Sequence, residues 1–356
     1  MDRREFLQTT TAGLAGAGLA SAATVAVATP AGTAPVSAPA VLRAPHELVL
    51  ALPVALDGMA IGGHAFALAR QIEAASGGRY RVSLSRIGVT GLEAVTTGEA
   101  DLYLACEHQH VSWHPALVAY SALPGAEHLG AYEFDAWMRV GGGADLADEI
   151  AGETGARLLL AGHTGPGTGL VSDTAVASVS DVQGRAVATR GLGRDVARML
   201  GATPLVLDDG EIPSALSSGT IAAAEPFLGD MPPLARFATA QGFHPGGFAL
   251  TLGLRTSLWG KLVPSDRAML EGVAAGAFAQ SMAEAMARRA MATVAAGHHR
   301  SPAASAMPAE LRAAIDDAAQ QAVSQLADQG ATSRRIVESL RAFRSLVRGP
   351  SGAVIA

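Results

Sequence analysis

Cysteine and charged residues are scarce in this chain of 356 residues. The single cysteine, Cys106, excludes a disulfide within the chain. Charged residues make up 16 % of the sequence and hydrophobic residues 49 %, the opposite of the balance found in disordered chains. The net charge of −6 argues against a nucleic-acid partner, because such a partner favours a basic surface. We therefore expect a large apolar core without covalent cross-links.

Motifs of several enzyme classes are also missing. The sequence has no G-x-S-x-G elbow and no recognisable set of nucleophile, base and orienting residue. Gly191 and Gly193 resemble the start of a dinucleotide-binding turn, but Val196 stands where that fingerprint needs its third glycine. We expect no enzymatic activity and no cofactor, and an exported enzyme on the same scaffold is kept as an alternative.

The N-terminal stretch combines paired arginines with small and apolar residues. Arg3 and Arg4 precede Phe6-Leu7, and a stretch rich in Ala, Gly and Thr follows. This order is typical of an export signal, and the arginine pair indicates the twin-arginine type. We predict that residues 1–28 are this signal and 29–46 a flexible leader, which places the mature protein in the periplasm.

Strand and helix patterns alternate along most of the chain, as they do in α/β proteins. They predict a first α/β lobe over residues 47–160 and a second over 161–252. Residues 253–356 have long helical patterns without strands. The expected architecture is an α/β fold with two lobes, similar to periplasmic binding proteins, and a helical C-terminal part.

Cys106, His108 and His110 are spaced two residues apart at the end of a predicted strand. In an extended strand, residues with this spacing share a face. Thiolate and imidazole groups on one face can bind zinc or copper. An exported metal-binding protein that uses these residues with Glu225 is therefore a second alternative, beside the interpretation that they line a cleft.

Four longer segments have a more specific pattern: AYEFDAWMRVGGGADLADEIAGE, AGHTGPGTG, VQGRAVATRGLGRDVARMLGATPLVLDDGEIPSALSSGTIAAAE and FHPGGFALTLGLRTSLWGKL. Together they resemble the periplasmic solute-binding receptors of TRAP transporters, most closely the branch that binds 2-oxo or 2-hydroxy acids. The resemblance implies a small organic ligand between two lobes that close around hinge strands near Ala161 and Leu252. It also implies the membrane subunits of a TRAP transporter as partners.

The same resemblance implies a set of ligand-binding residues. These are His108, Gln109, His110, His163, Arg190, Glu225 and Thr251. The family's carboxylate-binding arginine aligns with Ala188, so Arg190 is expected to hold the ligand carboxylate instead. The family's cation ligands align with Gly167, Glu225 and Thr251. Only Glu225 is retained, so we expect no metal and a direct contact between Glu225 and the ligand; Glu225 is the expected metal ligand if a cation is retained.

A C-terminal helix forms a dimer in the oxo-acid branch of this family. The segment RRIVESLRAFRSLV has an apolar stripe made of Ile336, Leu340, Phe343 and Val347. The resemblance therefore also predicts a homodimer through this helix.

Overall fold

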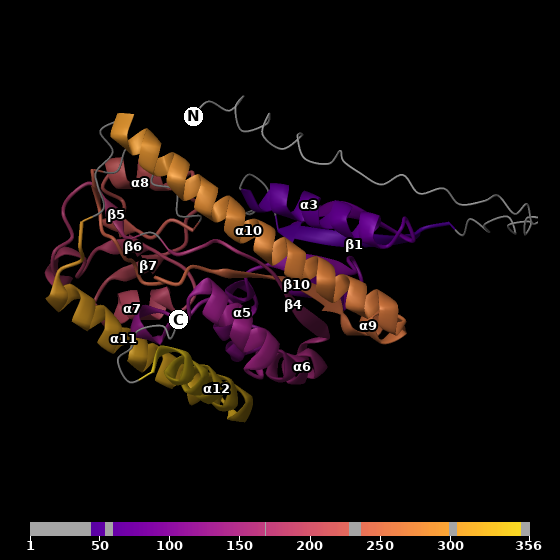
Figure 1. Cartoon of the computed structure of the whole chain (residues 1–356). Coiled ribbons are helices and arrows are strands. Elements are labelled where there is room, and N and C mark those ends of the chain that lie inside the picture. Colours follow the sequence, from indigo (N-terminus) through magenta and orange to yellow (C-terminus); the bar gives the residue numbers. More distant parts are fainter. Residues whose placement is uncertain (1–43, 54–59, 168, 228–235, 299–304, 350–356) are drawn as a thin grey trace, which may run out of the picture. The chain divides into compact units, whose positions relative to one another are not determined.

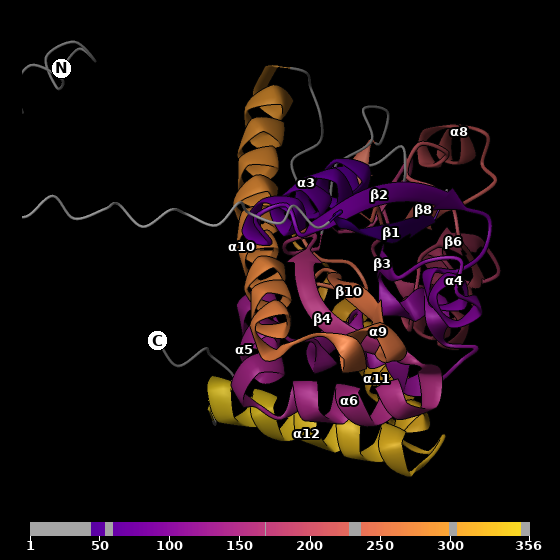
Figure 2. The ribbon, with the colours of Figure 1, turned by 90° about the vertical axis from the view of Figure 1, so that its right-hand side faces the viewer.

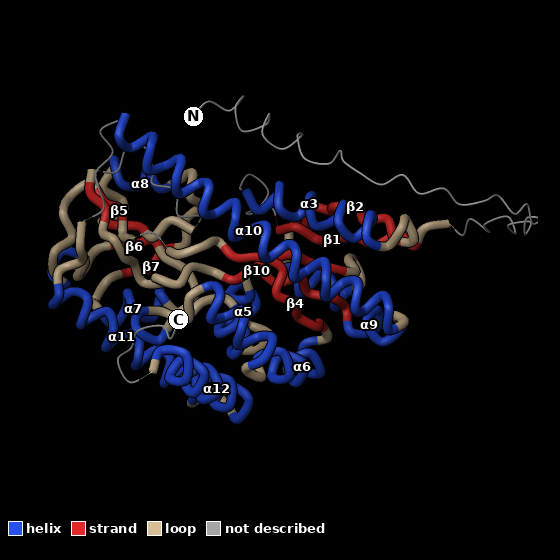
Figure 3. Tube along the Cα trace, in the orientation of Figure 1, coloured by secondary structure: helices blue, strands red, loops and turns tan. Residues whose placement is uncertain are grey.

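The computed structural model describes residues 44–53, 60–167, 169–227, 236–298 and 305–349. The predicted signal and nearly all of the predicted leader lie outside these residues. The described chain forms two five-stranded sheets with helices packed on them (Figure 1 and Figure 3). The prediction of an α/β fold with two sheets and a helical C-terminal part is confirmed.

The first sheet has the strand order β2-β1-β3-β10-β4. Its strands are β1 (His46–Pro53), β2 (Tyr80–Ile87), β3 (Leu102–Ala105), β4 (Ala156–His163) and β10 (Ala249–Arg255). Strand β1 runs parallel to β2 and β3, whereas β10 is antiparallel to both β3 and β4. Because β4 and β10 pair with each other over their length, the predicted lobe boundaries at residues 161 and 252 fall inside strands of the first sheet.

Both faces of the first sheet are covered, and side chains of β4 alternate between them as a strand requires. Leu158 and Leu160 pack in one apolar cluster, and Leu159 and Ala161 pack in the other. The first cluster includes α4 (Gly91–Thr97), α5 (Ala131–Val140), α6 (Gly143–Thr154) and α12 (Ala331–Arg348). The second includes α3 (Ala60–Ala75) and α10 (Pro264–His298), and Figure 2 shows α3 on one side of the strands of the first sheet and α6 and α12 on the other. Because these strands are buried on both faces, their sequences are continuous apolar runs.

The second sheet is built from the chain between β4 and β10. Its strand order is β7-β6-β8-β5-β9. The strands are β5 (Val171–Ser172), β6 (Ala186–Ala188), β7 (Thr203–Leu205), β8 (Ala223–Ala224) and β9 (Phe237–Ala238). Helices α7 (Gly193–Met199) and α8 (Ile212–Ser217) connect β6, β7 and β8, and α11 (Ala309–Ala327) packs on α7. The remaining short helix, α9 (Thr256–Lys261), follows β10.

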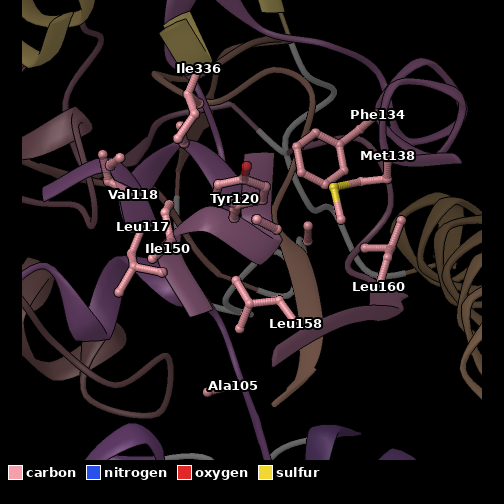
Figure 4. Packing of buried hydrophobic residues seen from close by; sticks show 14 of the residues in the cluster. Ala105, Leu117, Val118, Tyr120, Phe134, Met138, Ile150, Leu158, Leu160 and Ile336 are labelled. Atoms are coloured by element: carbon pink, nitrogen blue, oxygen red, sulfur yellow. The ribbon is translucent and has the colours of Figure 1, made fainter. Parts of the chain in front are cut away.

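The apolar stripe of α12 packs against its own chain. Ile336 and Leu340 are buried in the cluster that contains Trp137 and Ile150, and Phe343 packs against its edge. Figure 4 shows part of this core, with Ile336 near the Tyr120 side of the cluster. Ile336 and Leu340 are therefore covered by the chain's own core and not available to a second copy, and the homodimer through this helix stays a prediction. No helix within the described ranges is both long and apolar enough to cross a bilayer.

Candidate functional site

A cleft of about 570 Å³ is the candidate ligand-binding site. One wall comes from two 3-10 helices that follow β3, η1 (Glu107–His110) and η2 (Pro115–Tyr120). The opposite wall comes from the second sheet, through the turn after β6, α7 and the segment after β7. The end of α11 adds Leu326 and Gln329. The cleft thus lies where connections from the two sheets face each other.

Three guanidinium groups line the second-sheet wall at intervals of four residues: Arg190, Arg194 and Arg198. Arg198 donates to Asp195 Oδ1 at 2.5 Å. Arg190 donates to the carbonyl oxygen of Leu207 at 2.5 Å, and its guanidinium lies 5.1 Å from the ring centre of Phe227. Arg194 is exposed and makes no hydrogen bond or ion pair with any residue that the structure describes. Arg194 is therefore the arginine in the cleft whose donors are available to an anion.

The facing wall is mainly apolar, and His108 and Gln109 add polar groups to it. The Nδ1 atom of His108 lies 2.8 Å from Ser121 Oγ, and its ring packs 5.6 Å from that of Phe248. Burial lowers the pKa of His108 to about 3, and the positive charge of Arg190 adds to this effect. His108 is therefore neutral near pH 7. The structure brings His108, Gln109 and Arg190 together at one cleft.

The expected sharing of one face by Cys106, His108 and His110 is wrong. Strand β3 ends at Ala105, and residues 107–110 form a 3-10 helix with three residues per turn. Glu107 and His110 consequently share a side, and His110 Nδ1 lies 2.8 Å from Glu107 Oε2. His108 points elsewhere, into the cleft wall.

Glu107 is the centre of a fully buried polar cluster that the sequence reasoning missed. Its carboxylate accepts hydrogen bonds from the hydroxyl of Tyr103 at 3.0 Å and from the hydroxyl of Thr251. The backbone N–H of Leu92 donates to His110 Nε2 at 3.3 Å. His110 and Thr251 therefore contact Glu107 rather than the cleft. The only signal in the sequence is the spacing of three residues between Glu107 and His110.

Cys106 is a buried free thiol, and the geometry does not support the metal-binding alternative. Burial raises the pKa of the Cys106 thiol far above its ordinary value, and the nearby Glu107 carboxylate adds to this. Metal binding would require the thiolate. Within the described ranges, no three His, Cys, Asp or Glu side chains come close enough together to hold a metal ion.

Glu225 follows β8 and is also buried, with His244 as its principal partner. The backbone N–H of His244 donates to Glu225 Oε1 at 2.6 Å, and His244 Nδ1 lies 2.8 Å from Oε2. Although burial alone would raise the pKa of the Glu225 carboxyl, His244 and the Thr189 hydroxyl hold it below its ordinary value. The sequence predicted a direct ligand contact for Glu225 and not a pairing with His244. His244 was missed because nothing in the sequence pairs residue 244 with residue 225.

His163 lies away from the cleft, at the end of β4 beside α10. Its backbone N–H donates to Ser281 Oγ at 2.9 Å, and the N–H of Gly165 donates to His163 Nδ1 at 3.1 Å. Burial lowers the pKa of His163 to about 3. His163 lines a small pocket of about 20 Å³ together with His64 and Arg288.

The buried histidines predict a loss of stability in acid. An unfolded histidine titrates near pH 6.5, whereas burial lowers the pKa of His108 and His163 to about 3. Between these values the unfolded state binds protons that the folded state does not, so the free energy of unfolding falls as the pH falls. Each histidine contributes up to about 1.4 kcal/mol per pH unit.

We expect His163→Gln to reduce this pH dependence, because glutamine offers Gly165 an acceptor but does not titrate. Urea unfolding at about pH 7 and about pH 4.5 measures the slope. The exposed His46, changed to glutamine, is the matched control and should leave the slope unchanged. Equal slopes for His163→Gln and the wild type would contradict the prediction.

Comparisons with known proteins differ in how much of the chain they match. A scan of protein-family models finds no match. A curated relative, a monocarboxylate 2-oxoacid-binding periplasmic protein of a Nostoc species, is 31 % identical over 163 residues. That match spans 44 % of this chain and 44 % of the relative, so it covers less than half of the relative's length.

Solved structures match over most of the chain. A TRAP transporter solute-binding protein of Bordetella bronchiseptica, with calcium and picolinate in its active site, superposes with a TM-score of 0.76 at 22 % identity. The match covers 86 % of this chain and 94 % of that one. A TRAP periplasmic solute-binding protein of Pseudoalteromonas atlantica, with bound sodium and pyruvate, gives 0.75 at 18 % identity and covers 85 % and 95 %. The resemblance drawn from the sequence is confirmed in the fold, which is that of the TRAP solute-binding proteins.

Proposed function

We propose that this chain is a periplasmic solute receptor of a TRAP-type secondary transporter. It binds a small organic acid in the cleft and delivers it, chemically unchanged, to the membrane subunits. The observation that carries the proposal is the unpaired guanidinium of Arg194, which faces an apolar wall across a cleft of about 570 Å³. The fold and the Nostoc relative support the same function.

The lining of the cleft suits an anion with an apolar body. Guanidinium groups bind carboxylates by two parallel hydrogen bonds, and Arg194 has all its donors available. Val111, Pro115 and Val118 on the opposite wall offer apolar contact to the rest of the ligand. Arg190 is held in place by Leu207, Phe227 and an ion pair with Asp209, so it adds positive charge beside the ligand carboxylate while Arg194 supplies the free donors.

Closure of the two sheets on the ligand follows from the path of the chain. The chain leaves the first sheet after His163 at the end of β4 and returns at Ala249 at the start of β10. These crossings are the hinge of the proposed movement. The ligand favours the closed state only through contacts that it makes there and lacks in the open state.

We expect Arg194→Gln to weaken carboxylate binding by about 2 kcal/mol, roughly thirty-fold in Kd, as the loss of a charged hydrogen bond does. Thermal shift with a panel of small carboxylic acids identifies ligands, and calorimetry then gives the Kd of each variant. Arg139→Gln is the matched control, because Arg139 lies on α5, is exposed and pairs with Asp135. A folded wild type whose melting temperature no acid raises would contradict the proposed function. Equal Kd values for the Arg194 and Arg139 variants would place the carboxylate elsewhere.

A further inference from the structure

The residues of this chain do not fit the cation that accompanies the ligand in the two solved neighbours. The three positions expected to correspond to cation ligands are Gly167, Glu225 and Thr251. Gly167 has no side chain, and the Thr251 hydroxyl donates to Glu107. Both carboxylate oxygens of Glu225 already accept hydrogen bonds. Another group must therefore contact the ligand in place of the cation.

That group is the imidazole of His244, whose tautomer is set by Glu225. The ring nitrogen Nδ1 lies 2.8 Å from Glu225 Oε2, and a carboxylate can only accept, so Nδ1 carries the proton. The Thr189 hydroxyl donates to the same carboxylate oxygen at 3.0 Å. Neither of these interactions involves the other ring nitrogen of His244, Nε2. In a neutral imidazole protonated at Nδ1, Nε2 is a hydrogen-bond acceptor. Carboxylate–histidine pairs in enzymes hold the same tautomer.

The Nε2 atom of His244 is buried and finds no hydrogen-bond partner among the residues that the structure describes. A buried acceptor without a hydrogen-bond partner is unfavourable for the folded state. The atom lies behind the part of the cleft wall that Gly191 forms: a Cβ placed on Gly191 would stand 3.8 Å from Nε2 and 3.5 Å from His108 Cβ. Gly191 and His108 both line the cleft. Nε2 is not exposed to solvent, so a ligand atom reaches it through a shift of the turn at Gly191, which has no side chain and adopts a φ of +50°.

We propose that His244 Nε2 accepts a hydrogen bond from the ligand, and that Glu225 acts as the positioning residue for this imidazole. The inference rests on the proposed function and specifies its substrate class. The preferred ligand is a carboxylic acid that also bears a hydrogen-bond donor, a hydroxyl or an N–H group. A 2-oxo acid of the same size offers an acceptor to an acceptor and is disfavoured. A site built for a polar partner discriminates strongly against analogues that lack it.

The test uses pairs of acids that differ only in the donor, with excess EDTA present throughout. The pairs are lactate with pyruvate, 2-hydroxyisovalerate with 2-oxoisovalerate, and pyroglutamate with its lactone analogue. For each pair that binds, calorimetry should give a Kd at least about ten-fold lower for the member with the donor. A preference for the oxo or lactone member, equal affinities, or binding that is lost with EDTA would overturn the inference. If no acid binds, the proposed function fails as well.

His244→Asn is the informative variant, because its side-chain amide keeps a donor near Glu225 but has no counterpart of Nε2. We expect this variant to bind both members of a pair with the weaker Kd of the wild type. If this variant does not fold, the Kd values of the paired acids on the wild type still test the inference. A second readout is the ¹⁵N spectrum of the histidine rings. It should show His244 protonated at Nδ1 in the wild type, with an Nε2 resonance that shifts when the donor acid is added, and an unmoved Nε2 resonance would contradict the contact.

Discussion

Glu107→Ala is expected to lower the free energy of unfolding by about 3–5 kcal/mol. Glu107 is fully buried, and its carboxylate is the shared acceptor for Tyr103 and Thr251 and the partner of His110. Removing it leaves three buried polar groups without that partner, and each unpaired group costs free energy. The same helical turn holds His108 and Gln109 at the cleft, so ligand affinity should fall together with stability.

Urea unfolding measures this effect, and Glu99→Ala is its control. Glu99 is exposed and has no hydrogen bond or ion pair to another described residue, so its replacement should change stability by less than about 0.5 kcal/mol. Glu107→Gln keeps the shape of the side chain, so it should lower the free energy of unfolding by an amount between those of Glu107→Ala and Glu99→Ala. A loss below about 1 kcal/mol for Glu107→Ala would show that the cluster does not stabilise the fold.

Gly167→Ala is expected to destabilise the protein by about 1–3 kcal/mol and to weaken ligand binding. A Cβ on Gly167 would stand 2.1 Å from the carbonyl oxygen of His244, which is backbone and cannot rotate away. The N–H of Gly167 donates to the carbonyl of Pro245 at 3.1 Å, so the two segments are held in contact. Relief of the clash must move His244, and with it the proposed acceptor at Nε2.

Gly152→Ala is the control for this change. Gly152 lies on α6, is exposed, and a Cβ there would meet no atom within 4 Å. Alanine in a helix should be neutral or stabilising by up to about 1 kcal/mol. Thermal and urea unfolding of both variants, followed by calorimetry with the best acid, separates the two outcomes. If Gly167→Ala is as stable as Gly152→Ala and binds the acid normally, a side chain at position 167 does not displace the segment that contains His244, and the prediction is wrong.

The fold follows from local patterns that one sequence displays. The continuous apolar runs of β1 and β4 indicate strands that are buried on both faces, and glycines after the helices mark their ends. The membership of β4 and β10 in the first sheet is not local. It depends on the pairing of Leu159 with Leu252, which are far apart in the chain. The long apolar stripe of α12 indicates a covered face, but the sequence does not say whether its own chain or a second copy covers it.

The site was predictable only in part, for a similar reason. The resemblance to the TRAP receptors pointed to His108, Gln109 and Arg190, and all three line the cleft. His110 was misplaced because a 3-10 turn replaced the extended backbone that the spacing implied. The pair of Glu225 and His244 joins two segments 19 residues apart. The hydrogen bonds between Glu225 and His244 form only when folding brings these two segments together.

Calorimetry of the mature chain with its best acid, in excess EDTA, tests the central claim most directly. A solute receptor should show saturable binding of one ligand per chain, and the acid released on denaturation should be chemically unchanged. We predict this result because Arg194 lines the cleft and the proposed histidine acceptor, His244, lies behind its wall in place of a cation. A folded protein that binds no small organic acid, or one that returns a chemically altered compound, would contradict it.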